Sequence, residues 1–347
     1  MAIDISSLQR YIALNPLLIQ EKMYSELTLQ KASIQDVSGV VPGKFSNRYI
    51  TADAALGACC RVPTGSTTIS ERQAEVVCIL SGDEYCELDL AQIISNAIAE
   101  SQRARFTAGG ENAGSVESVI VDANRTSFVN KLETLSWIGD VTHASNDLNR
   151  TNGLITIGES DGSIRYTITA GNAFLGLSQA IKQLPADARR MGEMIGVFVP
   201  EEFAEAYYEA AMYMNLYHYN PGDFVSGAER PVIGKAGYTL IPTPGLYGTR
   251  KIMITPLDNI VWFNSHRDDH NTIDWDYEKY RQLYHWRIKT IFGVDLKRPE
   301  YAVIASYEDS ILEISESINV NITNTPLQTA ITSPVGANGG VFTENTL

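Results

Sequence analysis

The chain has 347 residues, of which 44% are hydrophobic and 20% charged, so a mainly disordered or fibrous protein is excluded. The 27 basic and 41 acidic residues leave a formal charge of −14. This balance disfavours proteins that grip nucleic acid or anionic membranes, because both need clustered Lys and Arg. No apolar run approaches the ~18 residues of a membrane helix, and Asp4 stands where a signal peptide carries Lys or Arg. We therefore expect a soluble intracellular protein of about two folding units.

The sequence pattern of the first 87 residues changes at about residue 36. Residues 1–35 mix apolar and polar side chains without a clean helical stripe, which is typical of an arm that packs on something else. From 36 to 87, glycines and prolines separate short β-type runs. This pattern predicts a long, thin β-hairpin with little core of its own.

Two helices are predicted next. Apolar residues repeat at helical spacing over 88–105, and a Gly-rich break follows. The longest helix is predicted over 115–137, ended by Gly139. Its apolar side is expected to hold Val116, Val119, Ile120, Ala123, Phe128, Leu132 and Leu135, and its polar side Ser127, Asn130, Lys131 and Glu133.

The second half of the chain alternates helices and strands. A loop-rich stretch is predicted over 140–170, and a helix over 171–184 that ends at Pro185. A buried strand over 194–200 leads into a helix with Pro200 at its first position and Glu201 and Glu202 at its positive end. Three β-type runs follow, which are YTLIPTP, RKIMITP and NIVWFNS, and then strands over 274–292 and 299–315, with a turn from Gly293 to Pro299.

The last 32 residues contain no Lys or Arg. Ile318, Val320 and Ile322 alternate with polar residues, which is the period of a half-buried strand. After Pro326 the composition of Thr, Ser, Asn and Gly is typical of an extended tail.

The four cysteines, at 59, 60, 78 and 86, do not have the paired spacing of a zinc site. The favoured interpretation is that they are small buried residues in a reducing compartment. The alternative is a redox-sensitive bridge in which Cys59 or Cys60 faces Cys78 across the hairpin.

Candidate chemistry is sparse. His266, Asp268, Asp269 and His270 follow an apolar strand and could hold a divalent metal, although a charged, solvated turn is the favoured interpretation. Neither a nucleophile elbow nor a phosphate-binding loop is present. The tyrosines at 207, 208, 213, 217 and 219 could stack bases, but on an acidic protein they are more typical of core and subunit interface. We therefore assign no catalytic, cofactor-binding or metal residue, and expect no enzyme activity and no cofactor.

Taken together, these segments resemble the major capsid proteins of tailed bacteriophages, which have the Hong Kong 97-type fold. The thin hairpin resembles the extended loop of that family, the 115–137 helix its spine helix, and the 171–250 block its axial domain. The strongest likeness is the run GYTLIPTPGLYGTRKIMITPLDNIVWFNSHRDDH, with its turn at Thr255, Pro256, Asp258 and Asn259. The versions that it resembles most are those of the crAss-like phages of gut bacteria.

The resemblance implies an α+β fold with an extended hairpin loop, a spine helix, and peripheral and axial domains. The implied division is an N-terminal arm at 1–35, the hairpin loop at 36–87, a peripheral domain at 88–140, the axial domain at 141–255, the return to the peripheral domain at 256–315 and a tail at 316–347. Some family members join subunits through a lysine on the extended loop. No lysine occurs between Phe45 and Cys86, so that crosslink is not expected here.

The implied function is a major capsid protein that self-assembles as hexamers and pentamers into the icosahedral phage head around double-stranded DNA. It would be assembled in the host cytoplasm, with a portal and a separate scaffold protein as partners, and a decoration protein left open. Packaged DNA would be held without sequence-specific binding, and no membrane is involved. One alternative is the shell of an encapsulin-type cargo compartment. A more distant alternative is a metal-dependent hydrolase centred on His266, Asp268, Asp269 and His270.

Overall fold

A computed structural model describes residues 26–53, 66–86, 116–190, 194–213, 230–232, 237–264 and 272–312, apart from 33, 39, 146, 170, 279 and 282. The chain divides into two units, 1–314 and 315–347, and every described residue belongs to the first. Several sequence predictions fall outside the described residues. These are the arm before residue 26, the hairpin tip at 54–65, the helix at 88–105, the His266–His270 turn and the tail.

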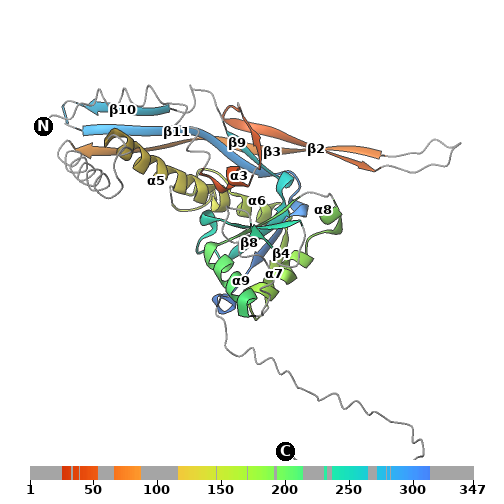
Figure 1. Cartoon of the computed structure of the whole chain (residues 1–347). Coiled ribbons are helices and arrows are strands. Elements are labelled where there is room, and N and C mark those ends of the chain that lie inside the picture. Colours follow the sequence, from red (N-terminus) through yellow and green to blue (C-terminus); the bar gives the residue numbers. More distant parts are fainter. Residues whose placement is uncertain are drawn as a thin grey trace, which may run out of the picture. The chain divides into compact units, whose positions relative to one another are not determined.

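The first of two sheets combines strands from both ends of the described chain (Figure 1). Its strand order is β1-β9-β11-β3-β2, with β10 paired to β11. The pairing of β1 with β9 is parallel, and the other pairings are antiparallel. The strands are β1 Gln35–Val37, β2 Gly43–Asp53, β3 Ser66–Cys86, β9 Ile260–Asn264, β10 Thr272–Glu278 and β11 Leu283–Leu296.

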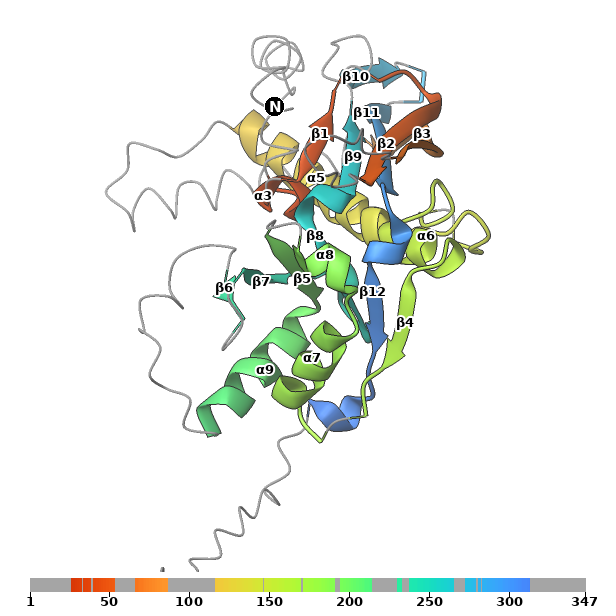
Figure 2. The same cartoon turned by 90° about the vertical axis from the view of Figure 1, so that its right-hand side faces the viewer.

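The second sheet has the order β4-β12-β8-β5-β7-β6. Two helices, α7 (Ala173–Lys182) and α9 (Glu201–Tyr213), lie side by side against it (Figure 2). Their apolar faces join the inner strands in one buried cluster, which includes Leu177, Phe203 and Val197. The strands are β4 Ile164–Thr167, β5 Ile195–Val199, β6 Arg230–Pro231, β7 Tyr238–Pro242, β8 Lys251–Pro256 and β12 Val303–Ser306.

The long helix α5 (Val116–Ile138) packs on the first sheet, and Gly139 follows its last residue. Phe128, Leu132 and Leu135 are buried as predicted. Two predictions about its faces are wrong, because Ala123 is exposed and Glu133 is buried. Glu133 faces inward since two N–H donors meet its carboxylate there. The short elements are α3 Thr28–Lys31, α6 Leu154–Ser160, α8 Ala186–Arg190, η2 Pro244–Leu246, η3 Leu257–Asn259, η4 Pro299–Tyr301 and η5 Asp309–Ile311.

Most of the helices and strands predicted for the second half of the chain are confirmed, but the strand predicted over 299–315 is wrong: only β12 (Val303–Ser306) is a strand, and η4 and η5 flank it. The strand over 194–200 is β5, all of whose residues are buried, and the helices over 171–184 and after Pro200 are α7 and α9. The Pro200 carbonyl accepts the first helical hydrogen bonds, from the N–H groups of Phe203 and Ala204, so Pro200 lies just before the helix. The runs YTLIPTP, RKIMITP and NIVWFNS form β7, β8 and β9.

Three other predictions are corrected. The predicted hairpin is too long: β2 pairs with β3 only as far as Val76, and the rest of β3 pairs with β11. The predicted strand over 274–292 is two antiparallel strands, β10 and β11. The predicted loop over 140–170 contains α6 and β4.

The predicted turn at Gly293 is wrong for a different physical reason. Gly293 lies inside β11, and a Cβ atom there would lie 2.7 Å from the Glu75 carbonyl oxygen and 3.2 Å from Val76 Cα. The glycine is therefore required by a close approach of two strands and does not mark a chain reversal.

Candidate functional site

The antiparallel ribbon formed by β2 and Ser66–Val76 is the most unusual feature of the first sheet. Its register runs from Gly43 opposite Val76 to Asp53 opposite Ser66. Among its described side chains, only Ala74 and Val76 are buried, both at the end next to the sheet. A two-stranded ribbon without a core is marginally stable in water. Its outer part therefore needs a surface from elsewhere to cover it.

Apolar side chains on β3 are exposed on this ribbon and next to it. Ile69 is 68% exposed and Leu80 is 61% exposed. Phe45 of β2 lies at the base of the ribbon. The centre of its ring is 5.1 Å from the centre of the Phe263 ring in β9. The ribbon is thus attached at its base and uncovered farther out.

The base of the ribbon is held by a charged contact. Arg72 Nε donates to Asp295 Oδ1 at 2.7 Å, and the same guanidinium pairs with Asp161. Asp295 is 1% exposed, and its burial raises the pKa of the carboxyl, an effect that Arg72 opposes. Burial lowers the pKa of Arg72, but the two carboxylates outweigh this and raise it. The contact joins β3 to β11 and to the end of α6.

A second contact lies beside the first. The guanidinium of Arg298 lies 4.9 Å from the centre of the Tyr49 ring in β2 and 5.1 Å from that of Tyr301 in η4. Such cation–π contacts contribute about 0.5–1 kcal/mol where they are exposed. Two arginines, one on the ribbon and one on the body, thus bridge the same junction.

The residues that precede the ribbon are fixed to α5 by a buried carboxylate. Glu133 accepts from the Thr28 backbone N–H at 3.0 Å and from Trp137 Nε1 at 2.9 Å. Burial raises the pKa of Glu133, and these hydrogen bonds oppose the shift. Arg125 adds an ion pair with Glu26 at 2.7 Å. Glu26 and Thr28 are therefore both held to α5.

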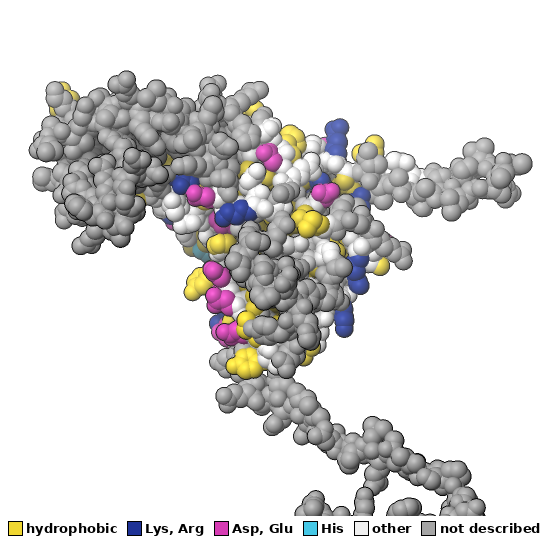
Figure 3. All heavy atoms as spheres, in the orientation of Figure 1, with side chains coloured by type: hydrophobic (Ala, Val, Ile, Leu, Met, Phe, Trp, Pro, Cys, Tyr) yellow, Lys and Arg dark blue, Asp and Glu magenta, His cyan; other side chains and the backbone are white. Residues whose placement is uncertain are grey.

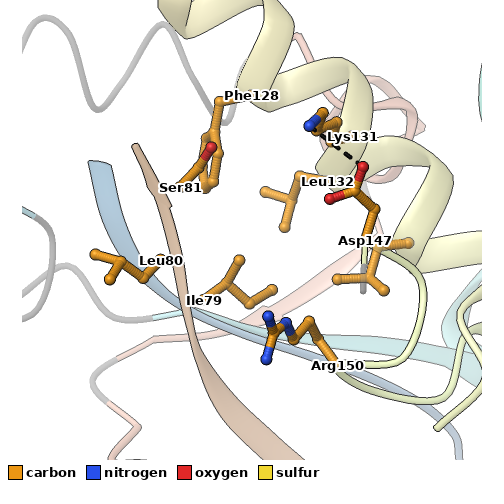
Figure 4. Close-up of a pocket in the computed structure, with 9 residues that line it drawn as sticks. Ile79, Leu80, Ser81, Phe128, Lys131, Leu132, Asp147 and Arg150 are labelled. Carbon is orange, nitrogen blue, oxygen red and sulfur yellow. Dashed lines mark ion pairs between the residues drawn. The ribbon is translucent and has the colours of Figure 1, made fainter. Parts of the chain in front are cut away.

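A small cavity of about 70 Å³ lies between β3 and α5 (Figure 4). Ile79, Phe128 and Leu132 form its apolar floor, and Lys131 and Asp147, which pair at 3.3 Å, lie at its rim. Pockets that bind small molecules have volumes of roughly 300–1,000 Å³. This cavity is too small for such a ligand.

A wider hollow of about 710 Å³ lies on the first sheet around His285. The two ring nitrogens of His285 each lie 3.4 Å from a carboxylate, Glu84 of β3 and Glu278 of β10. The walls of the hollow also include exposed acidic groups such as Asp83 and Asp276. Ligand pockets are mostly apolar, so this hollow is better described as a charged sheet surface.

The residues that the sequence singled out are only partly described. Tyr207 and Tyr208 are buried in the core of the second sheet as expected, whereas Tyr213 is 72% exposed. Cys78 is a free thiol, and the prediction that it is buried is wrong because it is exposed; Cys86 is only partly buried. Cys78 also lies opposite Ile291 of β11, beyond the segment paired with β2, so it does not face the other arm of the hairpin.

The candidate metal residues at 266–270 lie outside the described residues, as do the tyrosines at 217 and 219. Within the described ranges, no group of three or more His, Cys, Asp or Glu side chains could hold a metal ion. No helix in that same part of the chain is long and apolar enough to cross a membrane. Acidic, basic and apolar side chains are interspersed on the face drawn in Figure 3.

Sequence reasoning missed the contacts at the base of the ribbon. Arg72, Asp161 and Asp295 are far apart in the chain, and none belongs to a motif. The only sequence signal is an aspartate within the apolar run IFGVDL, which indicates a buried charge that needs a partner.

No family model matches the chain, and no curated protein matches it in sequence. Solved structures do match. A chain of the structure "Satellite phage P4 procapsid including size determination (Sid) protein" aligns with a TM-score of 0.56 and 10% identity, over 87% of this chain and 96% of that chain. A chain from Gordonia phage Cozz aligns with a TM-score of 0.50 and 10% identity, over 81% and 87% of the two chains.

These likenesses extend over most of this chain and most of each matched chain, so they concern the whole architecture and not one shared motif. At 10% identity they report on the fold alone. The chain therefore has the mixed α+β fold of the Hong Kong 97-type capsid proteins.

Proposed function

We propose that this protein is the major capsid protein of a tailed phage and has a structural role without enzyme activity. The observation that carries the proposal is the ribbon with an uncovered outer part, on a chain whose fold is that of capsid proteins. A neighbouring copy of the chain would bury the ribbon, and cyclic repetition of that contact would produce hexamers and pentamers. The shell would form the phage head.

In this proposal the two sheets have different roles. The second sheet with α7 and α9 serves as the axial domain, which meets its copies around the capsomer axis. The first sheet with α5 serves as the peripheral domain, from which the ribbon reaches a neighbour. Glu133 and the Arg125–Glu26 pair set the point from which the N-terminal arm extends.

The charge balance supports DNA as cargo without DNA as a specific ligand. A net charge of −14 keeps packaged DNA from sticking to the wall, because like charges repel. A portal and a separate scaffold protein are the further partners in this proposal, with a decoration protein as an optional addition. Placement in the crAss-like group rests on the sequence run from Gly237 to His270.

The test is to shorten the ribbon without disturbing the sheet. Residues 48–71 are replaced by Asn-Gly, which closes a two-residue turn on the Asn47–Arg72 pair. Such a subunit should keep its fold and lose the ability to form shells, as measured by circular dichroism and electron microscopy. A deletion that reached residue 80 would be less informative, because it removes β3 residues that pair with β11.

The matched control exchanges residues within the same segment instead of removing it. Thr67 and Thr68 are exposed, and their replacement by Ser keeps the length of the ribbon. This variant should form normal shells. Normal shells from the shortened chain as well would overturn the proposed function of the ribbon.

A further inference from the structure

Arg72 occupies the border between the attached and the uncovered part of the ribbon. On the β3 side, Ala74 and Val76 are buried, whereas none of the described side chains from Ser66 to Glu71 is buried. Phe45 of the partner strand packs on Phe263 at the same base. Any rotation of the outer ribbon relative to the sheet therefore has its pivot close to Arg72.

The guanidinium at this border contacts two different elements of the body. Its Nε lies 2.7 Å from Asp295 of β11, and its Nη2 pairs with Asp161 after α6. The planar guanidinium fixes the directions of its N–H groups, so two carboxylates on separate elements define its orientation. A lysine, which carries a single point charge, cannot reproduce this constraint.

The neighbouring arginine on the ribbon makes a different contact. Arg48 pairs with Glu71 at 3.3 Å, and both residues belong to the ribbon. This exposed pair therefore connects the two strands to each other and not to the body. The two arginines lie on adjacent residue pairs of one ribbon, and they differ in what they hold.

A contact on the other strand supports the same orientation. Tyr49 lies on the same face of the ribbon as Arg72, because it is two residues from Asn47, which pairs with Arg72. The guanidinium of Arg298 lies over the Tyr49 ring. Arg298 also lies over Tyr301, so the body side of this contact is itself held in place. Both strands of the ribbon are thus fixed to the body on one face.

We propose that Arg72, through Asp295 and Asp161, is a positioning residue that sets the angle at which the ribbon leaves the subunit. The angle is decided inside each subunit before any neighbour is met. This inference rests on the proposed function, since the angle selects where the ribbon contacts the next copy. It adds that assembly depends on a contact made within one subunit.

The experiment measures the angle itself in the unassembled full-length chain. Spin labels are placed at Thr68 on the ribbon and Asn130 on α5, both exposed, in a background with all four cysteines replaced by serine. Pulsed dipolar spectroscopy then gives the distribution of label-to-label distances. The variants are Arg72→Gln, Arg72→Lys and, as the matched control, Arg48→Gln.

The expected result is a narrow distribution for the parent and for Arg48→Gln, and a broad one for Arg72→Gln. Arg72→Lys should be intermediate, because one ammonium can satisfy one carboxylate at a time. In parallel, the yield of shells should fall roughly tenfold for Arg72→Gln and stay near the parent value for Arg48→Gln.

An unchanged, narrow distribution in a folded Arg72→Gln chain would overturn the inference. If Arg72→Gln does not fold, Arg72→Lys decides: a distribution as narrow as that of the parent overturns the inference, and a broadened one supports it. If distances change as expected but the parent never forms shells, the positioning role stands and the proposed function fails. The two ideas therefore fail separately.

Discussion

The two sheets of this protein differ in how completely their own chain covers them. The second sheet and its two helices share one buried cluster, with β5 buried along its whole length. In the first sheet, β3 alternates between buried and exposed residues, and its outer third has no buried side chain. The described part of the chain buries the second sheet, whereas it leaves the outer segment of the first sheet exposed.

This difference separates fold stability from assembly. Changes among the buried residues of either sheet should lower the free energy of unfolding. Changes on the outer ribbon should affect only the association of subunits. The following four predictions, in decreasing order of their expected effect on that free energy, test where the border between these two classes lies.

Trp137→Ala should have the largest effect on stability. Trp137 is fully buried, lies 4.8 Å from the ring of Phe198 in β5 and donates to Glu133, so it joins α5 to the second sheet. Such a truncation costs about 3–5 kcal/mol. Urea unfolding should show this loss. A loss below ~1 kcal/mol would mean that the two sheets are stabilised independently of this side chain.

Gly293→Ala should have the next largest effect. The new methyl group would meet the Glu75 carbonyl and Val76 and push β3 away from β11 at the base of the ribbon. Forced overpacking of this kind costs about 1–3 kcal/mol. Hydrogen exchange should show faster exchange in β3 than in β5, and equal acceleration in both would contradict a local effect. Gly162→Ala does not serve as a control, because Gly162 has a φ of +95° and a side chain there would strain the backbone.

Glu133→Gln tests the buried carboxylate through its pH dependence. Burial raises the native-state pKa, so the native protein binds this proton more tightly than the unfolded chain does. The stabilisation is present below the pKa of the unfolded chain and is lost as the pH rises through the native-state pKa. As the pH falls from 7 to 5, the free energy of unfolding of the wild type should therefore rise relative to that of Glu133→Gln. A shift in the opposite direction would contradict this assignment.

Ile69→Asn should have the smallest effect on stability and a large one on assembly. Ile69 is 68% exposed on the outer ribbon, so its replacement should change the free energy of unfolding by no more than ~0.5 kcal/mol. Shell yield should nevertheless fall in sedimentation assays, since the proposed apolar contact with the next copy would be lost. Val141→Asn in the turn after α5, at a side chain that is 46% exposed and outside both proposed contact regions, is the control for a general effect of a new polar group.

The sequence predicts the second sheet better than the first. β5, α7 and α9 have strong local signals, which are a continuous apolar run, helical periodicity and Pro200 before an acidic first turn. In the first sheet, β3 changes partner from β2 to β11 at Val76 and Val77, and no local pattern encodes such a change. Gly293 was predicted as a turn because a strand glycine needed for close packing has the same local signal.

The candidate site is also only partly predictable. The thin ribbon and its poverty of core residues follow from the glycines, prolines and short β-type runs of residues 36–87. The Arg72–Asp295–Asp161 contact does not, because it depends on three segments that only the tertiary fold brings together. Likewise, the periodicity of α5 places Glu133 on the polar side, and only the position of Thr28 and Trp137 explains its burial.

The most direct test of the central claim, that copies of this chain assemble into shells, is light scattering coupled to size-exclusion chromatography, with negatively stained grids of the same fractions. We expect megadalton particles or ring-shaped capsomers. A single species at the monomer mass of 38.2 kDa, at every protein concentration and ionic strength tested, would contradict the claim.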